Sequence, residues 1–77
     1  MTGETKKLAV DIPIGGKVIS VNVKAGDKVK EGDLLCLIEA MKMENPIYSP
    51  IDGTVVQIGV TVEQAVKPGS TIAIIEY

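Results

Sequence analysis

The chain has 77 residues, ten acidic residues against eight lysines, a net charge of −2, and no histidine, arginine, tryptophan or phenylalanine. That length allows one small domain, and without histidine the usual general base and the commonest metal ligand are missing, so we expect neither independent catalysis nor a metal site. Because its only aromatics are two tyrosines, the chain also lacks the stacked aromatics and basic groove of a single-strand binder, and we expect no nucleic-acid partner.

Residues 1–8 are polar and charged, and we predict a flexible leader there, followed by one domain of residues 9–77. No apolar run approaches the length of a membrane span, and no signal core follows the charged start, so we expect no membrane insertion. Cys36 is the only cysteine, which excludes an internal disulfide and fits a reducing compartment. Together these features predict a cytoplasmic protein.

Glycine and proline recur every several residues after the leader, and β-branched residues dominate between them, which indicates short strands joined by tight turns. The clearest strand is residues 18–23. Its apolar residues alternate with Ser20 and Asn22, so Ile19, Val21 and Val23 are predicted to face the core.

Two glycine-containing turns, at residues 25–27 and 31–33, bracket a short element at residues 28–30. The run 34–40 follows, and it is apolar on both faces until Glu39. That pattern predicts a strand that is covered on both sides.

Residues 34–48 are predicted to form a hairpin with Met41 and Lys42 near its tip. A two-residue hairpin turn favours Asn-Gly or Asp-Gly, because a positive φ is costly for residues with a Cβ. Met-Lys is a poor choice on those grounds. A position that breaks a local rule without structural gain is a candidate functional site.

The two halves of the chain repeat each other. A shift of 37 positions places residues 13–40 over residues 50–77 without a gap, and ten of the 28 aligned pairs are identical, including Gly16/Gly53 and Glu39/Glu76. The repeat of the first strand, residues 55–60, has Val56, Ile58 and Val60 at the inward positions. About four strands per half predict an all-β fold, a flattened barrel or sandwich of two four-stranded antiparallel sheets with pseudo-twofold symmetry, called a barrel-sandwich hybrid.

The segment without a repeat partner is residues 41–49, which holds one lysine between two methionines. A duplicated scaffold with one extra segment suggests a platform that presents that segment. Cys36 aligns with Ala73 and is therefore predicted to be a small buried residue, not a redox site.

The heptapeptide Glu39-Ala40-Met41-Lys42-Met43-Glu44-Asn45 resembles the attachment site of biotinyl domains, the biotin carboxyl carrier members of the biotinyl/lipoyl-attachment family. Residues 16–18, 26–34 and 50–55 resemble the family's other motifs, so the resemblance covers residues 13–77. It implies biotin as the cofactor, held covalently by an amide to Lys42. It also implies the family type that lacks a protruding thumb insertion, because residues 26–34 run on to the lysine without interruption.

The resemblance implies a non-catalytic carrier domain or subunit of a biotin-dependent carboxylase, decarboxylase or transcarboxylase. Its partners would be a biotin protein ligase, a biotin carboxylase, and a carboxyltransferase or decarboxylase subunit, and biotin on Lys42 would shuttle CO2 between the last two. The expected ligase-recognition residues are Ala40, Met41, Met43 and Glu44.

Two other interpretations stay open. Lipoyl domains are the nearest relatives of biotinyl domains, although methionine on both sides of Lys42 favours biotin. An unmodified β-domain used for assembly is the alternative from another class. The sequence also departs from the family pattern: Pro46 directly after Asn45 predicts that the next strand starts late, and Glu63-Gln64-Ala65 replaces the glycine turn of the first half.

Overall fold

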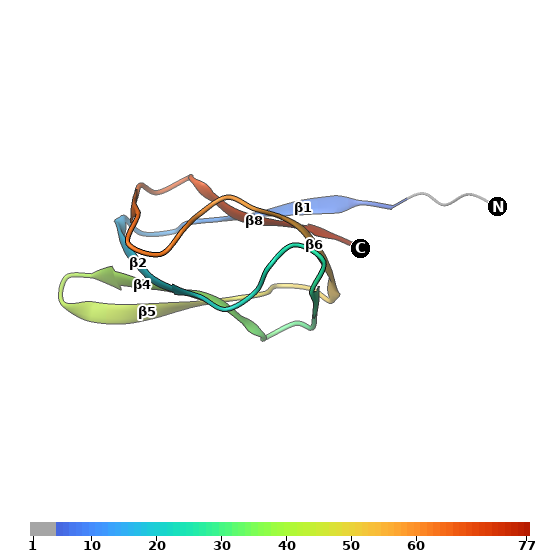
Figure 1. Ribbon diagram of the computed structural model, residues 1–77, viewed down its shortest axis with the longest axis horizontal. Helices are drawn as coiled ribbons and strands as arrows, with labels where there is room; N and C mark the ends of the chain where they lie inside the picture. Colours follow the sequence, from blue (N-terminus) through green and yellow to red (C-terminus); the bar gives the residue numbers. More distant parts are fainter. Residues whose placement is uncertain (1–4) are drawn as a thin grey trace.

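Two four-stranded antiparallel sheets contain every strand of residues 5–77, the part of the chain that the computed structural model describes (Figure 1). One sheet has the order β1-β8-β6-β3, formed by Lys7–Asp11, Thr71–Glu76, Gly53–Ile58 and Lys28–Val29. The other has the order β5-β4-β2-β7, formed by Met43–Tyr48, Leu34–Ala40, Gly16–Val21 and Ala65–Val66. The predicted all-β fold is confirmed. Within residues 5–77 there is no helix long and apolar enough to cross a membrane.

Each sheet takes two strands from each half of the chain, and the pairings of the two sheets correspond after a shift of 37 residues. Lys17 lies opposite Glu39 in one sheet, and Thr54 lies opposite Glu76 in the other. The same rule relates the β4–β5 hairpin to the pairing of β8 with β1, since the Glu39–Glu44 pair corresponds to Glu76–Lys7. The repeat therefore includes β1, which has no detectable sequence likeness to β5.

The first strand begins inside the segment that we predicted to be a leader. β1 starts at Lys7, which lies opposite Glu76, and Leu8 lies opposite Ile75. Lys6 and Tyr77 also exchange two backbone hydrogen bonds of 2.8 Å each. The predicted boundary at residue 8 thus falls within a paired strand, because β8 offers hydrogen bonds that a local sequence pattern does not reveal. Residues 1–4 of the predicted leader lie outside the described residues.

The predicted inward faces of the two clearest strands need correction, because each strand contains a register shift. Pairing with the neighbouring strand shifts between Val18 and Ser20, and again between Val55 and Gln57. Val18 and Val55 are completely buried, whereas Val56 is 38% exposed. The irregularity adds a residue on one strand and so exchanges the two faces.

Beyond the irregularity the predicted parity holds. Val21, Val23 and Ile58 pack against the core while partly buried, and Val60 is buried. The prediction was therefore right for the second part of each strand and wrong at Ile19 and Val56.

The central strand β4 is covered on both faces only near its start. Leu35 and Cys36 are both buried, because the pairing with β5 shifts register between Leu34 and Cys36. From there the strand alternates, with Ile38 buried and Glu39 exposed. The irregularity accounts for the two consecutive buried residues, and Leu37 is half-buried, so the predicted cover on both sides holds at the start of the strand and is only partial beyond it.

Cys36 is a buried core residue, as predicted, and its repeat partner Ala73 is also fully buried. Burial raises the pKa of the Cys36 thiol, because desolvation disfavours the thiolate. The folded chain therefore holds this proton more tightly than the unfolded chain does. This contribution to stability is complete below the ordinary thiol pKa and is lost as the pH rises above it.

We expect the Cys36 thiol to react with a disulfide reagent at pH 8 only after unfolding in denaturant, because the native side chain is inaccessible. Native labelling at the unfolded rate would contradict its buried position. Cys36→Ala is the matched control, since the repeat already carries alanine at this place. In urea titrations we expect that variant to lose less stability than the unaltered chain above about pH 8.5.

Glu63 adopts the backbone conformation that its repeat partner Gly26 adopts. Their φ angles are 76° and 100°, both in the left-handed region that glycine favours. The turn departs from the family pattern in sequence but keeps the geometry. The Glu63 carboxylate lies 2.9 Å from the Lys17 ammonium. The hydrogen bond and the charge of Glu63 raise the pKa of Lys17 above its ordinary value, and the charge of Glu39 adds a smaller effect.

Glu63→Gly is expected to stabilise the protein by up to about 1 kcal/mol. A left-handed residue with a Cβ costs about 1–2 kcal/mol, and the larger entropy loss of glycine offsets about 0.5–1 kcal/mol of that gain. Thermal unfolding should then show a Tm that is roughly 2–8 °C higher. Glu63→Gln keeps the strain and removes only an exposed ion pair, so its Tm should change little. A glycine variant with a lower Tm would disprove this account.

Candidate functional site at the β4–β5 hairpin turn

The β4–β5 hairpin closes in a two-residue turn at Met41 and Lys42. Pairing runs from Leu34 opposite Tyr48 to Ala40 opposite Met43, so only two residues remain for the turn. Met41 and Lys42 have φ angles of 54° and 64°. Positive φ at both central residues is what a type I′ hairpin turn requires, and Asn-Gly is the usual sequence there. The turn is as tight as the sequence argument assumed, and two residues with side chains hold the strained conformation.

The hairpin turn projects at one end of the molecule, and Lys42 is exposed there (Figure 1). Met41 is 87% exposed and Met43 is 65% exposed. Lys42 takes part in none of the side-chain hydrogen bonds or ion pairs found in residues 5–77. Its amine is therefore accessible to a second protein, and an apolar surface flanks it.

The four residues predicted to be recognised by a ligase do not form one surface. Ala40 ends β4 with its side chain buried, so it is not available for direct contact, and only its small size bears on access to the turn. Glu44 lies opposite Glu39, one position along from the Ala40–Met43 pair, and so projects from the other face of the sheet. Met41 and Met43 are the exposed residues beside Lys42.

Asn45 supports the hairpin and was not singled out from the sequence. Its side-chain amide donates to the carbonyl oxygens of Ile38 at 3.3 Å and Met43 at 3.2 Å. The corresponding residue in β1 is Leu8, which lacks these donors. The signal in the sequence was a polar residue where the repeat partner is apolar, but it becomes visible only once β1 and β5 are known to correspond.

Pro46 lies within β5, so the prediction that this strand starts late is wrong. The strand begins at Met43, directly after the turn. β5 is an edge strand, and there a proline costs no ladder hydrogen bond if its nitrogen points away from the neighbouring strand.

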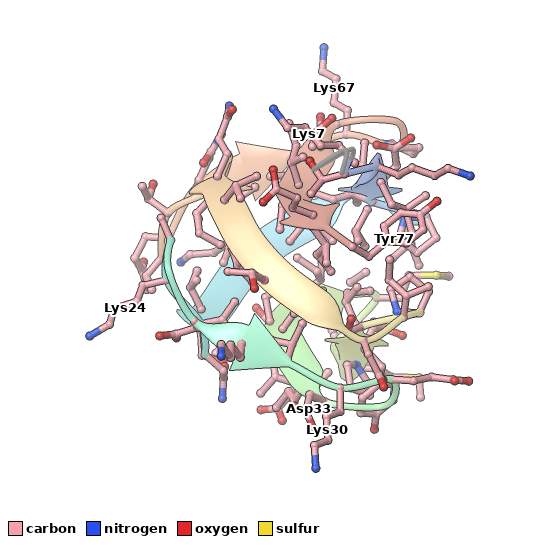
Figure 2. The ribbon with its side chains drawn as sticks, turned by 90° about the vertical axis from the view of Figure 1, so that its right-hand side faces the viewer. Lys7, Lys24, Lys30, Asp33, Lys67 and Tyr77 are labelled. Atoms are coloured by element: carbon pink, nitrogen blue, oxygen red, sulfur yellow. The ribbon has the colours of Figure 1, made fainter. Side chains whose placement is uncertain are left out.

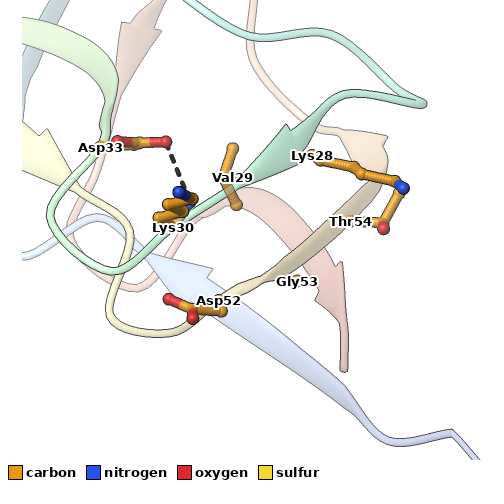
Figure 3. A pocket seen from close by; sticks show the side chains of 7 residues that line it. All are labelled: Lys28, Val29, Lys30, Asp33, Asp52, Gly53 and Thr54. Atoms are coloured by element: carbon orange, nitrogen blue, oxygen red, sulfur yellow. Dashed lines mark hydrogen bonds between the residues drawn. The ribbon is translucent and has the colours of Figure 1, made fainter.

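A surface hollow of about 410 Å³ lies beside the paired strands β3 and β6, lined by Lys28, Val29, Lys30, Asp33, Asp52, Gly53 and Thr54 (Figure 3). Figure 2 shows the end of the molecule away from the hairpin turn, and Lys30 and Asp33 are labelled at its lower edge. Asp33 accepts the backbone N–H of Lys30 at 2.9 Å, and Asp52 accepts that of Glu31 at 2.8 Å. Both carboxylates thus stabilise turns, and the hollow offers no converging set of reactive groups.

A duplicated all-β sandwich that presents one lysine on a strained hairpin turn defines a carrier-type domain of the biotinyl and lipoyl class. The chain belongs to the family described as "Biotin-requiring enzyme", whose profile matches residues 8–75. The predicted family and the predicted cofactor, biotin, are confirmed. Residues 26–33 contain only β3 and its flanking turns, and β4 begins at Leu34, in keeping with the predicted type without a thumb insertion.

Similar proteins include two decarboxylase subunits. The chain is 58% identical over 40 residues to the gamma subunit of glutaconyl-CoA decarboxylase from Acidaminococcus fermentans, which covers 52% of this chain and 28% of that subunit. It is 51% identical over 41 residues to the gamma subunit of methylmalonyl-CoA decarboxylase from Veillonella parvula. That alignment covers 53% of this chain and 32% of that subunit. The alignments thus span a third or less of these subunits.

Among solved structures, the urea carboxylase of Kluyveromyces lactis superposes with a TM-score of 0.84 at 27% identity, over 91% of this chain and 6% of that one. A single-chain, multi-domain long-chain acyl-CoA carboxylase superposes with a TM-score of 0.83 at 28% identity, over 88% of this chain and 7% of that one. The fold of this chain is therefore found as a small part of much larger carboxylases.

Proposed function

We propose that Lys42 is the biotin attachment residue and that the domain is a non-catalytic carrier of a biotin-dependent carboxylase, decarboxylase or transcarboxylase. The observation that carries this proposal is the two-residue turn, which holds an exposed lysine between two exposed methionines at the end of the β4–β5 hairpin. Family membership supports the cofactor. The geometry supports the residue, because the strained turn has no evident structural benefit.

The residues present fit a covalently attached biotin. The Lys42 amine is exposed, so a biotin protein ligase can bring an activated biotin carboxyl group to it. Nζ of Lys42 would be the nucleophile, forming an amide bond to the biotin carbonyl carbon while the nucleotide leaving group and a proton would depart. The lysine loses its charge, and its four-carbon stem becomes part of a longer tether. Met41 and Met43 offer the ligase an adaptable apolar contact.

When attached, biotin supplies the chemistry of taking up and releasing a carboxyl group, and the protein supplies position. The hairpin turn holds the tether away from both sheets, so that it reaches active sites that the domain itself does not enter. Tethering also raises the local concentration of the carried group at each of those sites. We propose a biotin carboxylase as the loading partner and a carboxyltransferase or decarboxylase as the unloading partner, and we keep the cytoplasmic location as a prediction.

Intact-mass measurement tests the attachment. After incubation with biotin, ATP and a biotin protein ligase, the chain should gain the mass of one biotinyl group. Absence of that gain would refute the proposal, and a gain only with lipoate and a lipoate ligase would assign the domain to the lipoyl type. Modification by neither would favour an unmodified assembly domain. The carrier role is then tested by supplying a biotin carboxylase, ATP and labelled bicarbonate, after which the biotinylated chain should retain label that acid releases.

A further inference from the structure

Within residues 5–77, one sheet edge remains open to pairing with another strand. The edge strands of the two sheets are β1, β3, β5 and β7. Such edges present unpaired N–H and C=O groups to other chains. β3 and β7 are two residues long, too short to template another strand. β5 contains Pro46, which has no N–H to donate. β1 is five residues long and has no proline.

The alternation of backbone hydrogen bonds along β1 shows which backbone groups face its free edge. Lys6 bonds with Tyr77 through both its N–H and C=O, and Ile12 likewise donates to Ser70 and accepts from Gly69. Alternation along an antiparallel pair then directs the backbone groups of Lys7, Ala9 and Asp11 away from β8. Their side chains are exposed on the outer face (Lys7 is labelled in Figure 2), so three consecutive sets of donors and acceptors are accessible.

We propose that β1 pairs with β1 of a second copy of this chain, antiparallel and centred on Ala9. Lys7 then lies opposite Asp11 of the second copy, and the twofold axis repeats this pair. Both side chains are on the outer face, where opposite charges across a pair of strands stabilise it. The β1-β8-β6-β3 sheet of one copy and the same sheet of the second copy then become one sheet of eight strands.

The side chains of β1 suit this register. Ala9 is small and exposed at the centre, so two copies approach without a clash. On the inner face, half-buried Leu8 comes beside Val10 of the second copy, which extends the apolar core. The equivalent strand β5 would bring together two prolines at the corresponding centre. The hairpin turn with Lys42 belongs to the other sheet and stays free, so this pairing does not depend on the proposed carrier function.

Sedimentation velocity from about 10 μM to about 1 mM tests the pairing. We expect the mass of the 77-residue chain to rise from 8.1 kDa to twice that value with concentration. Ala9→Pro removes one donor per copy at the centre and should weaken dimerisation at least tenfold. Pro46 already occupies the equivalent position of β5, so the fold should tolerate this change. Its circular dichroism and biotin acceptance should match those of the unaltered chain.

Exchanging the charges of Lys7 and Asp11 tests the same pairing independently. Lys7→Glu places two acids opposite each other and should weaken the dimer about tenfold, as Ala9→Pro does. Within one copy, Lys7→Glu also places a glutamate opposite Glu76. The equivalent pair in the other sheet is Glu44 opposite Glu39, so the fold accommodates two acids at this place. Adding Asp11→Lys restores unlike charges and should recover most of the affinity. A chain that stays monomeric at every concentration, or a dimer unaffected by both Ala9→Pro and Lys7→Glu, would overturn the proposal.

Discussion

Lys42→Arg is expected to abolish the gain of one biotinyl group in the presence of biotin, ATP and a biotin protein ligase. Arginine keeps the positive charge, the length and the backbone demands of lysine at this turn. Its guanidinium stays protonated and is not an acyl acceptor under these conditions, whereas a lysine amine is. The expected effect is therefore a complete loss of modification without a loss of folding. Intact mass and circular dichroism measure the two properties separately.

Lys24→Arg and Lys67→Arg are the matched controls. Both lysines are exposed, as Lys42 is, but neither has a methionine beside it. Each variant should accept biotin to the same extent as the unaltered chain. Modification that persists in Lys42→Arg and disappears in one of the controls would place the attachment elsewhere and refute the assignment.

The strained turn also predicts that a better turn sequence raises the stability of the protein. Met41→Asn together with Lys42→Gly installs the pair of residues that a type I′ turn favours. Asparagine tolerates the left-handed conformation better than methionine does. Lys42→Gly removes a cost of about 1–2 kcal/mol, of which the larger entropy loss of glycine offsets about 0.5–1 kcal/mol, so this double variant should be more stable by up to about 1 kcal/mol. It should also accept no biotin. A gain in stability with a loss of modification would show that the turn sequence serves recognition at the expense of the fold.

Gly16→Ala is expected to destabilise the protein by about 3 kcal/mol or more, the largest effect of a single methyl group that we anticipate. A Cβ on Gly16 would clash with the carbonyl oxygen of Glu39 and would lie 2.9 Å from Cγ2 of Ile38. Both atoms belong to the central strand β4, so β2 and β4 would have to separate. A domain of this size has roughly 4–12 kcal/mol of stability in total. Urea unfolding followed by circular dichroism measures the loss.

The repeat and a neighbouring glycine provide the comparisons. Gly53→Ala should be similarly harmful, because a Cβ there would lie 2.5 Å from the carbonyl oxygen of Glu76. Gly15→Ala should cost less than about 1 kcal/mol, since its closest contact is 3.3 Å from Cδ of Pro68, a side-chain atom. Equal stability of Gly15→Ala and Gly16→Ala would show that β2 and β4 separate readily and that the close approach is unimportant.

Much of this architecture could be predicted because the sequence contains an internal repeat, so that each half can be compared with the other. The repeat of 37 residues fixed the two related halves and isolated the segment around Lys42 as the part without a partner. It also paired Gly16 with Gly53, which the structure places in strands, at equivalent close approaches that the sequence did not reveal. Turn chemistry then identified Met41 and Lys42 as anomalous, and both residues have positive φ.

Other features could not be predicted because they depend on pairing between distant strands. The register shifts after Val18 and Val55 exchange inward and outward faces, and an alternating local pattern carries no sign of them. β1 is short and begins next to the charged start of the chain, and its pairing with β8 defines its first residues. At the hairpin, the support that Asn45 gives depends on the carbonyl of Ile38 across the sheet.

The backbone bonds between Lys6 and Tyr77 have a consequence for how this domain can be built. They occupy the place that the Ala40–Met43 pair occupies in the hairpin, at the opposite end of the molecule (Figure 1). A linker of two residues from Tyr77 to Lys6 would therefore close the backbone into a ring with two equivalent hairpins. Cutting that ring at the original turn would give a circularly permuted chain with every strand pairing retained, and a Met-Lys linker would place a second lysine at the position equivalent to Lys42.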